Sequence, residues 1–209
     1  MNKPCKIIQT SPQHTGSTVL VNLIHGFLLP REGVKYLSHL ATATERNEYI
    51  NKYFIIKTHD IRIDNFIKDF KNCNMYFIVS LRDNYDRIDS KYQKYDNVLI
   101  IDYSEINETE ENSLKNIVNV VFNKLKTFLP NDILPKKNDT EIKNSMFDRI
   151  ASMNKTYEEI RHKSFEYHDK FYHIHGNHRA HAKTIVFREC PKCGFTAGPK
   201  HFRTVRVGE

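Results

Sequence analysis

Glycine and proline are scarce in this chain, with 7 of each among 209 residues. Hydrophobic residues make up 39% and charged residues 27%, which excludes a disordered or collagen-like chain and is typical of a globular protein. No apolar run approaches the ~20 residues of a membrane-spanning helix. No secretory signal fits the N-terminus, where an apolar pair follows Lys6 directly. We therefore expect a cytoplasmic protein without a membrane span.

Cysteine is also scarce, and 4 cysteines in a chain of this length argue against a disulfide scaffold and for a reducing compartment. The net charge is +7, which favours anionic partners such as nucleotides, nucleic acids, or sulfated and phosphorylated molecules. Lysines are spread along the whole chain, so the charge alone does not indicate nucleic acid.

The length predicts a single domain over residues 1–209, with a core at 1–130 and a helical, His- and Cys-rich part at 131–209. Apolar runs indicate buried strands at 6–10, 53–57, 75–81 and 98–103, and 34–40 fits either a strand or a turn. Helical periodicity indicates helices at 18–29, 63–70, 84–93, 113–129 and 141–168. This alternation predicts a three-layer α/β fold, in which helices flank a central parallel sheet and ligands bind at the carboxyl ends of the strands.

A loop with phosphate-binding character follows the first strand, as Thr10-Ser-Pro-Gln-His-Thr-Gly-Ser-Thr18. Gly16 has access to backbone angles that are closed to other residues. Ser17 and Thr18 place hydroxyl and N–H groups at a helix N-terminus, where the helix dipole favours an anion. No Lys precedes Ser17, so the nucleoside-triphosphate loop pattern is absent. A plain helix cap is the alternative, but the position directly after a buried strand favours phosphate binding.

Two further segments carry candidate chemistry after later strands. In Lys57-Thr58-His59, a His at a strand end has the chemistry of a general base, and Lys57 points to the same side of an extended segment. Arg82 follows strand 75–81 and its planar fork suits a phosphate, while Ser90 comes eight residues later. The alternatives are a solvent-exposed His and surface ion pairs around the Arg.

In order and spacing, these three segments resemble the sulfotransferases that use 3′-phosphoadenosine 5′-phosphosulfate (PAPS). The family's loop for the 5′-phosphosulfate is similar to Pro12–Thr18, its Lys-Thr-His segment with the catalytic base to 57–59, and its Arg and Ser for the 3′-phosphate to Arg82 and Ser90. The resemblance covers residues 5–103. It implies a P-loop-like sulfotransferase architecture, PAPS or its product adenosine 3′,5′-bisphosphate (PAP) as cofactor, and a hydroxyl-bearing small molecule or glycan as acceptor.

The resemblance also implies a role for each site residue. His59 would act as the base, while Lys57 and His14 would stabilise charge on the departing oxygen. The cofactor contacts would come from Gln13, His14, Thr15, Gly16, Ser17, Thr18, Arg82 and Ser90. His14 stands where the family has Lys or Arg. The family's C-terminal Lys-Gly-x-x-Gly-Asp loop is missing, and Arg179 is our candidate replacement.

The C-terminal tail contains Cys190-Pro-Lys-Cys193-Gly after a cluster of histidines. This pattern is half of a zinc ribbon, and a second Cys pair is lacking. A structural zinc site with Cys190 and Cys193 as ligands and a turn with two free thiols both remain open.

Two other functions also remain open. One is a small-molecule or nucleotide kinase on a related P-loop fold, against which the missing loop Lys speaks. The other is a non-catalytic, basic nucleic-acid-binding protein with a zinc knuckle.

Overall fold

The computed structural model describes residues 3–12, 15–28, 54–59, 62–82, 92 and 94–160, and the backbone of 39–40, 167–168, 174–175, 188–189 and 196–197. None of the helices among these residues is long and apolar enough to cross a membrane.

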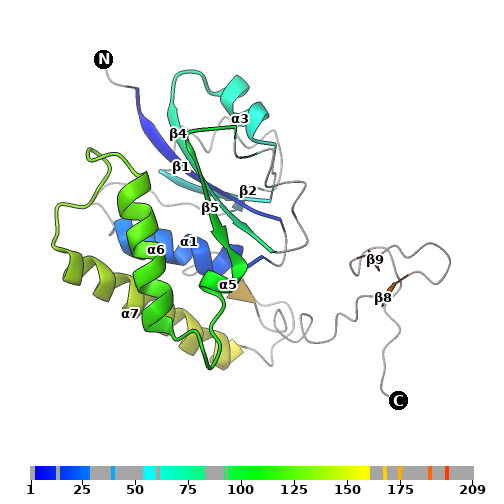
Figure 1. The fold of residues 1–209 in the computed structure, drawn as a ribbon, viewed down its shortest axis with the longest axis vertical. Helices are drawn as coiled ribbons and strands as arrows, with labels where there is room; N and C mark the ends of the chain where they lie inside the picture. Colours follow the sequence, from blue (N-terminus) through cyan, green and yellow to red (C-terminus); the bar gives the residue numbers. More distant parts are fainter. Residues whose placement is uncertain are drawn as a thin grey trace.

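The centre of the fold is a parallel sheet of five strands in the order β2-β3-β1-β4-β5 (Figure 1). The strands are β1 (Cys5–Thr10), β2 (His39–Leu40), β3 (Ile55–Thr58), β4 (Asn74–Leu81) and β5 (Val98–Asp102). The register pairs Thr10 with Thr58, and Gln9 with Ile78. The carboxyl ends of the three central strands therefore lie along one edge of the sheet, which we call the rim.

Helices cover both faces of this sheet, as expected from strands that are apolar on both sides. On one face, Ile7, Ile55 and Ile78 pack with residues of α1 (Ser17–Leu28), α6 (Leu114–Phe128) and α7 (Asp139–Ile160). On the other face, Ile8, Ile56 and residues of α3 (Ile63–Asp69) form a second cluster. Figure 1 shows α1, α6 and α7 together on one side of the strands and α3 apart from them, at the top of the view. The predicted three-layer α/β fold is confirmed.

Polar residues at the helix ends explain where the later helices begin. The side chain of Ser113 accepts a hydrogen bond from the backbone N–H of Asn116 and caps α6. Asn138 Oδ1 accepts from the N–H of Glu141, whose carboxylate accepts from the N–H of Asn138. This reciprocal pair begins α7. Four residues of α7, Ile142, Met146, Ile150 and Met153, belong to the same core cluster as α1, so α7 shares the core of the sheet.

Several element boundaries differ from the prediction. Tyr103 does not end a strand but begins the four-residue helix α5 (Tyr103–Ile106), since Asp102 forms a capping box there. The predicted helix 141–168 is wrong at its end, because α7 ends at Ile160 and Tyr167–His168 forms strand β6, antiparallel to β7 (Ile174–His175). The predicted helix 84–93 lies outside the described residues except for Tyr92, which is helical.

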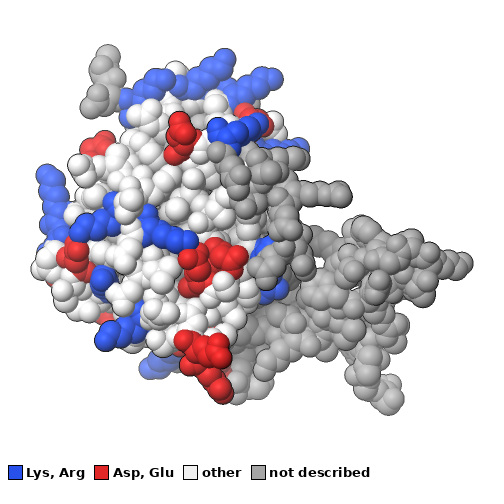
Figure 2. All heavy atoms as spheres, in the orientation of Figure 1, with Lys and Arg blue, Asp and Glu red and all other residues white. Residues whose placement is uncertain are grey.

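Charged side chains do not form one basic stripe on the described part of the face in Figure 2. Lys and Arg gather at the end of the molecule near α3, while positive and negative side chains alternate over the rest of this face. The charge distribution on this face therefore does not by itself mark an anion-binding site.

Candidate functional site

The N-terminus of α1 lies directly at the rim. Gly16 has φ 77°, and a Cβ at this position would lie 2.7 Å from Ile106 Cδ1, so both conformation and space require glycine. The first helical hydrogen bond runs from the N–H of Leu20 to the carbonyl of Gly16, at 2.9 Å. The preceding N–H groups of the first turn therefore have no partner within the helix. No acidic residue lies in this turn, and its field favours an anion.

A buried polar network fixes the loop before this helix to the neighbouring strand β4. Ser11 Oγ accepts hydrogen bonds from Gln9 Nε2 at 2.6 Å, from the Ser80 N–H at 2.8 Å and from Ser80 Oγ at 2.9 Å. Thr15 Oγ1 donates to the carbonyl of Pro12 at 2.8 Å and lies 3.2 Å from Ser80 Oγ. Gln9, Ser11, Thr15 and Ser80 are all fully buried. Sequence reasoning assigned no role to Gln9, Ser11 or Ser80.

Lys57 extends from the end of β3 to the first turn of α1, which follows this loop. Its Nζ donates a hydrogen bond to Thr18 Oγ1 at 2.8 Å, and the residue is 2% exposed. Burial lowers the pKa of the Lys57 ammonium from 10.5 to about 7, because the charged form loses its hydration. An anion bound at the N-terminus of α1 would favour the charged form and raise this pKa again.

His59 is oriented by the backbone of the loop. Its Nδ1 lies 2.8 Å from the carbonyl oxygen of Ser11. A carbonyl only accepts hydrogen bonds, so Nδ1 carries a proton, and in the neutral ring the lone pair belongs to Nε2. A histidine base is usually arranged in this way, with one ring nitrogen held by a hydrogen bond so that the other can take up a proton.

Arg82 lies on the same side of the molecule as Gly16, since Arg82 contacts the ring of Tyr103 and Gly16 lies close to the same ring. The Arg82 guanidinium carbon is 3.8 Å from the centre of this ring, a favourable cation–π distance. Tyr103 Cδ2 lies 3.2 Å from the position that a Cβ on Gly16 would take. Arg82 Nε is buried and has no hydrogen-bond partner among the described residues, which is uncommon for a buried donor.

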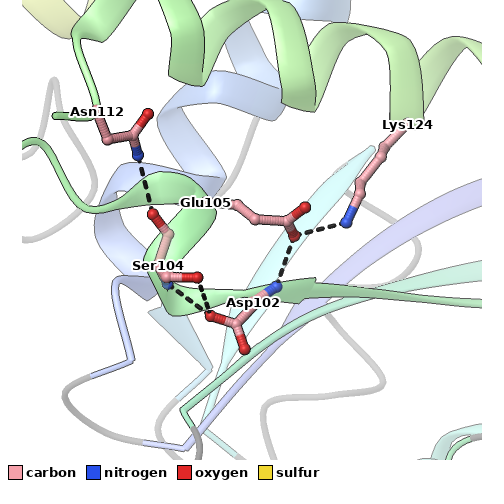
Figure 3. A network of polar contacts seen from close by, with 5 residues as sticks. All are labelled: Asp102, Ser104, Glu105, Asn112 and Lys124. Carbon is pink, nitrogen blue, oxygen red and sulfur yellow. Dashed lines mark hydrogen bonds and ion pairs between the residues drawn. The ribbon is translucent and has the colours of Figure 1, made fainter.

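The helix that carries Tyr103 is itself held firmly in place, as Figure 3 shows. Asp102 Oδ1 accepts from the N–H and the hydroxyl of Ser104, at 2.7 and 2.5 Å. Glu105 Oε2 accepts from the N–H of Asp102 at 2.9 Å and from Lys124 Nζ of α6 at 2.5 Å. Asn112 Nδ2 donates to the carbonyl of Ser104 at 2.9 Å. The position of Tyr103, close to both Gly16 and Arg82, is therefore fixed from β5 and from α6.

The structure thus gathers seven of the predicted site residues around the N-terminus of α1: Thr15, Gly16, Ser17, Thr18, Lys57, His59 and Arg82. Gln13, His14, Ser90, Arg179, Cys190 and Cys193 lie outside the described residues. Strands β8 (Arg188–Glu189) and β9 (Thr196–Ala197) flank the cysteine pair in sequence and pair antiparallel. Within the described part of the chain, no group of three or more His, Cys, Asp or Glu side chains is placed to hold a metal ion.

No protein-family model and no curated protein sequence matches the chain. Among solved structures, the chain is similar to the crystal structure of mouse sulfotransferase SULT7A1 complexed with PAP, with 17% sequence identity and a TM-score of 0.49. The similarity covers 73% of this chain and 66% of that chain, so the chain spans slightly less than two thirds of the length of this relative. A TM-score of this size does not establish a common fold, and the fold assignment therefore rests on the strand order and helical layers described above.

Proposed function

We propose that the chain is a sulfotransferase that transfers the sulfuryl group of PAPS to the hydroxyl group, or the amine, of an acceptor. The observation that carries this proposal is the convergence of three segments, distant in sequence, on the N-terminus of α1. Lys57 contacts Thr18, His59 contacts the backbone of Ser11, and Arg82 shares the ring of Tyr103 with Gly16. Their order and spacing are those on which the family resemblance depends.

In the proposed reaction, an oxygen of the acceptor attacks the sulfur of PAPS, and the bond from sulfur to the bridging phosphate oxygen breaks. His59 Nε2 takes the acceptor's proton, and PAP leaves with the electron pair of the broken bond. The N–H groups at the start of α1 and the Lys57 ammonium, which hydrogen-bonds to Thr18 there, would stabilise the charge that develops on the bridging oxygen. In this proposal, catalysis comes from positioning and from electrostatic stabilisation of the departing oxygen.

The two phosphate ends of the donor would bind near Tyr103, one at Gly16 and one at Arg82. The 5′-phosphosulfate would bind at Gly16 and the first turn of α1, and the 3′-phosphate would bind at Arg82, whose buried Nε is available as a donor. In this proposal Arg82 binds the 3′-phosphate, a group that ATP lacks. The Lys that a triphosphate-binding loop carries before its Ser is absent before Ser17. Both features favour PAPS over magnesium-bound ATP as the donor. The kinase alternative predicts the opposite preference.

A thermal-shift titration with PAP, adenosine 5′-monophosphate and magnesium-ATP tests the proposal, since a ligand of the folded state raises its stability. We expect PAP to give the largest shift. Arg82→Ala should weaken PAP binding by about tenfold or more and leave the weaker binding of the monophosphate unchanged. Lys71→Ala, which removes an exposed charge at the opposite end of β4, is the matched control. Equal losses for PAP and the monophosphate would exclude a 3′-phosphate role, and a preference for magnesium-ATP would favour a kinase.

Transfer itself is measured with sulfur-labelled PAPS and a panel of phenols, sugars and amines. Because PAPS hydrolysis by water also releases PAP, the labelled acceptor has to be isolated. Transfer to at least one acceptor is the expected result, and PAP binding without transfer to any of them would limit the function to donor binding.

A further inference from the structure

A chain of hydrogen bonds connects α7 to the lysine at the rim. Arg149 Nε donates to Asn22 Oδ1 at 3.0 Å, although the two residues are 127 positions apart. Asn22 is fully buried on α1, and its Nδ2 donates to the backbone carbonyl of Thr18 at 2.8 Å. Thr18 Oγ1 in turn accepts from Lys57 Nζ. These contacts connect α7 to the end of β3 through two residues of α1, and at Thr18 they pass from the backbone carbonyl to the side-chain hydroxyl.

Tight packing of the two helices keeps Arg149 in reach of Asn22. A Cβ on Gly26 would lie 2.7 Å from Met146 Cα, so the backbones of α1 and α7 are in close contact there. Asn22 lies one turn before Gly26, and Arg149 lies one turn after Met146, on the same side of its helix. Close helix contact at Gly26 thus directs Arg149 toward the N-terminal half of α1.

The charge of Arg149 also affects the pKa of a second residue of α1, His25. His25 is buried beside it, and desolvation together with the Arg149 charge lowers the pKa of His25 to about 3. His25 is therefore neutral at physiological pH, and Arg149 supplies the positive charge in this interface.

We propose that Arg149 is a positioning residue of the donor site: it fixes the amide of Asn22, which fixes Thr18, which holds the Lys57 side chain at the N-terminus of α1. This inference rests on the proposed function insofar as the donor is PAPS. The part of the chain after the strands would then take part in donor binding through α7, without contact between Arg149 and the donor.

The test compares Arg149→Met, Arg149→Lys and Lys143→Met in the full-length chain. Lys143 is the matched control, because it lies on α7, carries the same charge and has its Nζ 4.6 Å from the ring of Phe122 of α6. The first measurement is PAP affinity by calorimetry. The second is the rate at which a limiting amount of acetic anhydride labels Lys57, relative to exposed lysines, followed by mass spectrometry. The second measurement needs no nucleotide and is therefore independent of the proposed function.

We expect Arg149→Met to weaken PAP binding about tenfold, the effect of one lost charge-assisted hydrogen bond in the support of a site, and to raise the labelling rate of Lys57 severalfold. Lys143→Met should leave both values within twofold of the original chain. Arg149→Lys keeps the charge but not the planar fork, so its PAP affinity and its Lys57 labelling rate should lie between those of Arg149→Met and Lys143→Met. This variant provides the same two measurements if Arg149→Met does not fold.

The outcomes separate the two proposals. Faster labelling of Lys57 in a chain that does not bind PAP would support the positioning role and refute the donor. Unchanged labelling in the Arg149 variants would overturn the positioning role, whether or not PAP binding is weakened, because the proposed connection passes through Lys57.

Discussion

Replacing Lys57 by methionine tests whether the rim is built for an anion at the expense of stability. Lys57 is 2% exposed, and burial lowers its pKa from 10.5 to about 7. Each unit of pKa corresponds to about 1.36 kcal/mol, so holding the charged form in this environment costs roughly 5 kcal/mol. The hydrogen bond to Thr18 that the variant loses contributes about 1 kcal/mol. Methionine has a similar length and no charge, so Lys57→Met should be more stable by roughly 2 to 4 kcal/mol at pH 6.

The sign of the pH dependence follows from the two states of the chain. Below pH 7 the lysine is charged in both states, and the folded state bears the full cost. Between pH 7 and 10.5 the unfolded state holds a proton that the folded state has lost, so the stability of the original chain rises with pH. The advantage of Lys57→Met should therefore be largest at pH 6 and should shrink steadily toward pH 10.

Urea denaturation followed by circular dichroism at pH 6, 8 and 9.5 measures this difference. Lys68→Met, an exposed lysine on α3, is the control and should change the free energy of unfolding by less than about 0.5 kcal/mol at every pH. The same Lys57→Met protein should bind PAP poorly. A variant that is less stable than the original chain at pH 6, or an advantage that does not vary with pH, would refute a destabilising buried charge.

Three further substitutions have defined outcomes. His59→Ala should lower the turnover of sulfuryl transfer by about 10²–10⁴-fold, the usual contribution of a general base, at unchanged PAP affinity; near-normal turnover by the labelled-PAPS assay would remove His59 from that role. Gly16→Ala should weaken PAP binding in calorimetry and destabilise the fold by about 1–3 kcal/mol, because φ is 77° and the new Cβ would meet Ile106 Cδ1 at 2.7 Å; a wild-type affinity would contradict this account. Gly26→Ala should also cost about 1–3 kcal/mol in urea denaturation, since its Cβ would meet the Met146 backbone, and a neutral effect would show that α1 and α7 separate easily.

The strands and the long helices were predictable because their sequences are strongly periodic or continuously apolar. Observed strand ends differ from the predicted ones by one or two residues, as for Ile55–Thr58 against 53–57. The four-residue helix α5 was missed because its first residue, Tyr103, was predicted to continue β5, and only the capping pair of Asp102 and Glu105 marks the helix start. For the same reason, Tyr103 was not among the predicted site residues, although its ring lies close to both Gly16 and Arg82.

Arg149 was beyond prediction for a different reason. Nothing in its local sequence separates it from the other charged residues of a polar helix, and its partner Asn22 is 127 residues away. Only the packing of α7 on α1 brings them together. The spacing of Lys57 and His59, in contrast, already predicted that both face one side, and both contact the loop around the start of α1.

The strongest overlooked signal in the sequence is a set of polar residues inside apolar strands. Gln9 and Ser80 follow apolar residues near the carboxyl ends of β1 and β4, and both are fully buried. Gln9 Oε1 has no hydrogen-bond partner among the described residues, and a buried, unpaired amide oxygen costs about 1–3 kcal/mol. At both positions, burying an apolar side chain would cost less free energy than burying a polar one. Their hydrogen bonds to Ser11 support instead the loop that precedes Gly16. Together with the buried ammonium of Lys57, they concentrate residues that are costly for folding at one rim of the sheet, and such clusters are characteristic of ligand-binding sites.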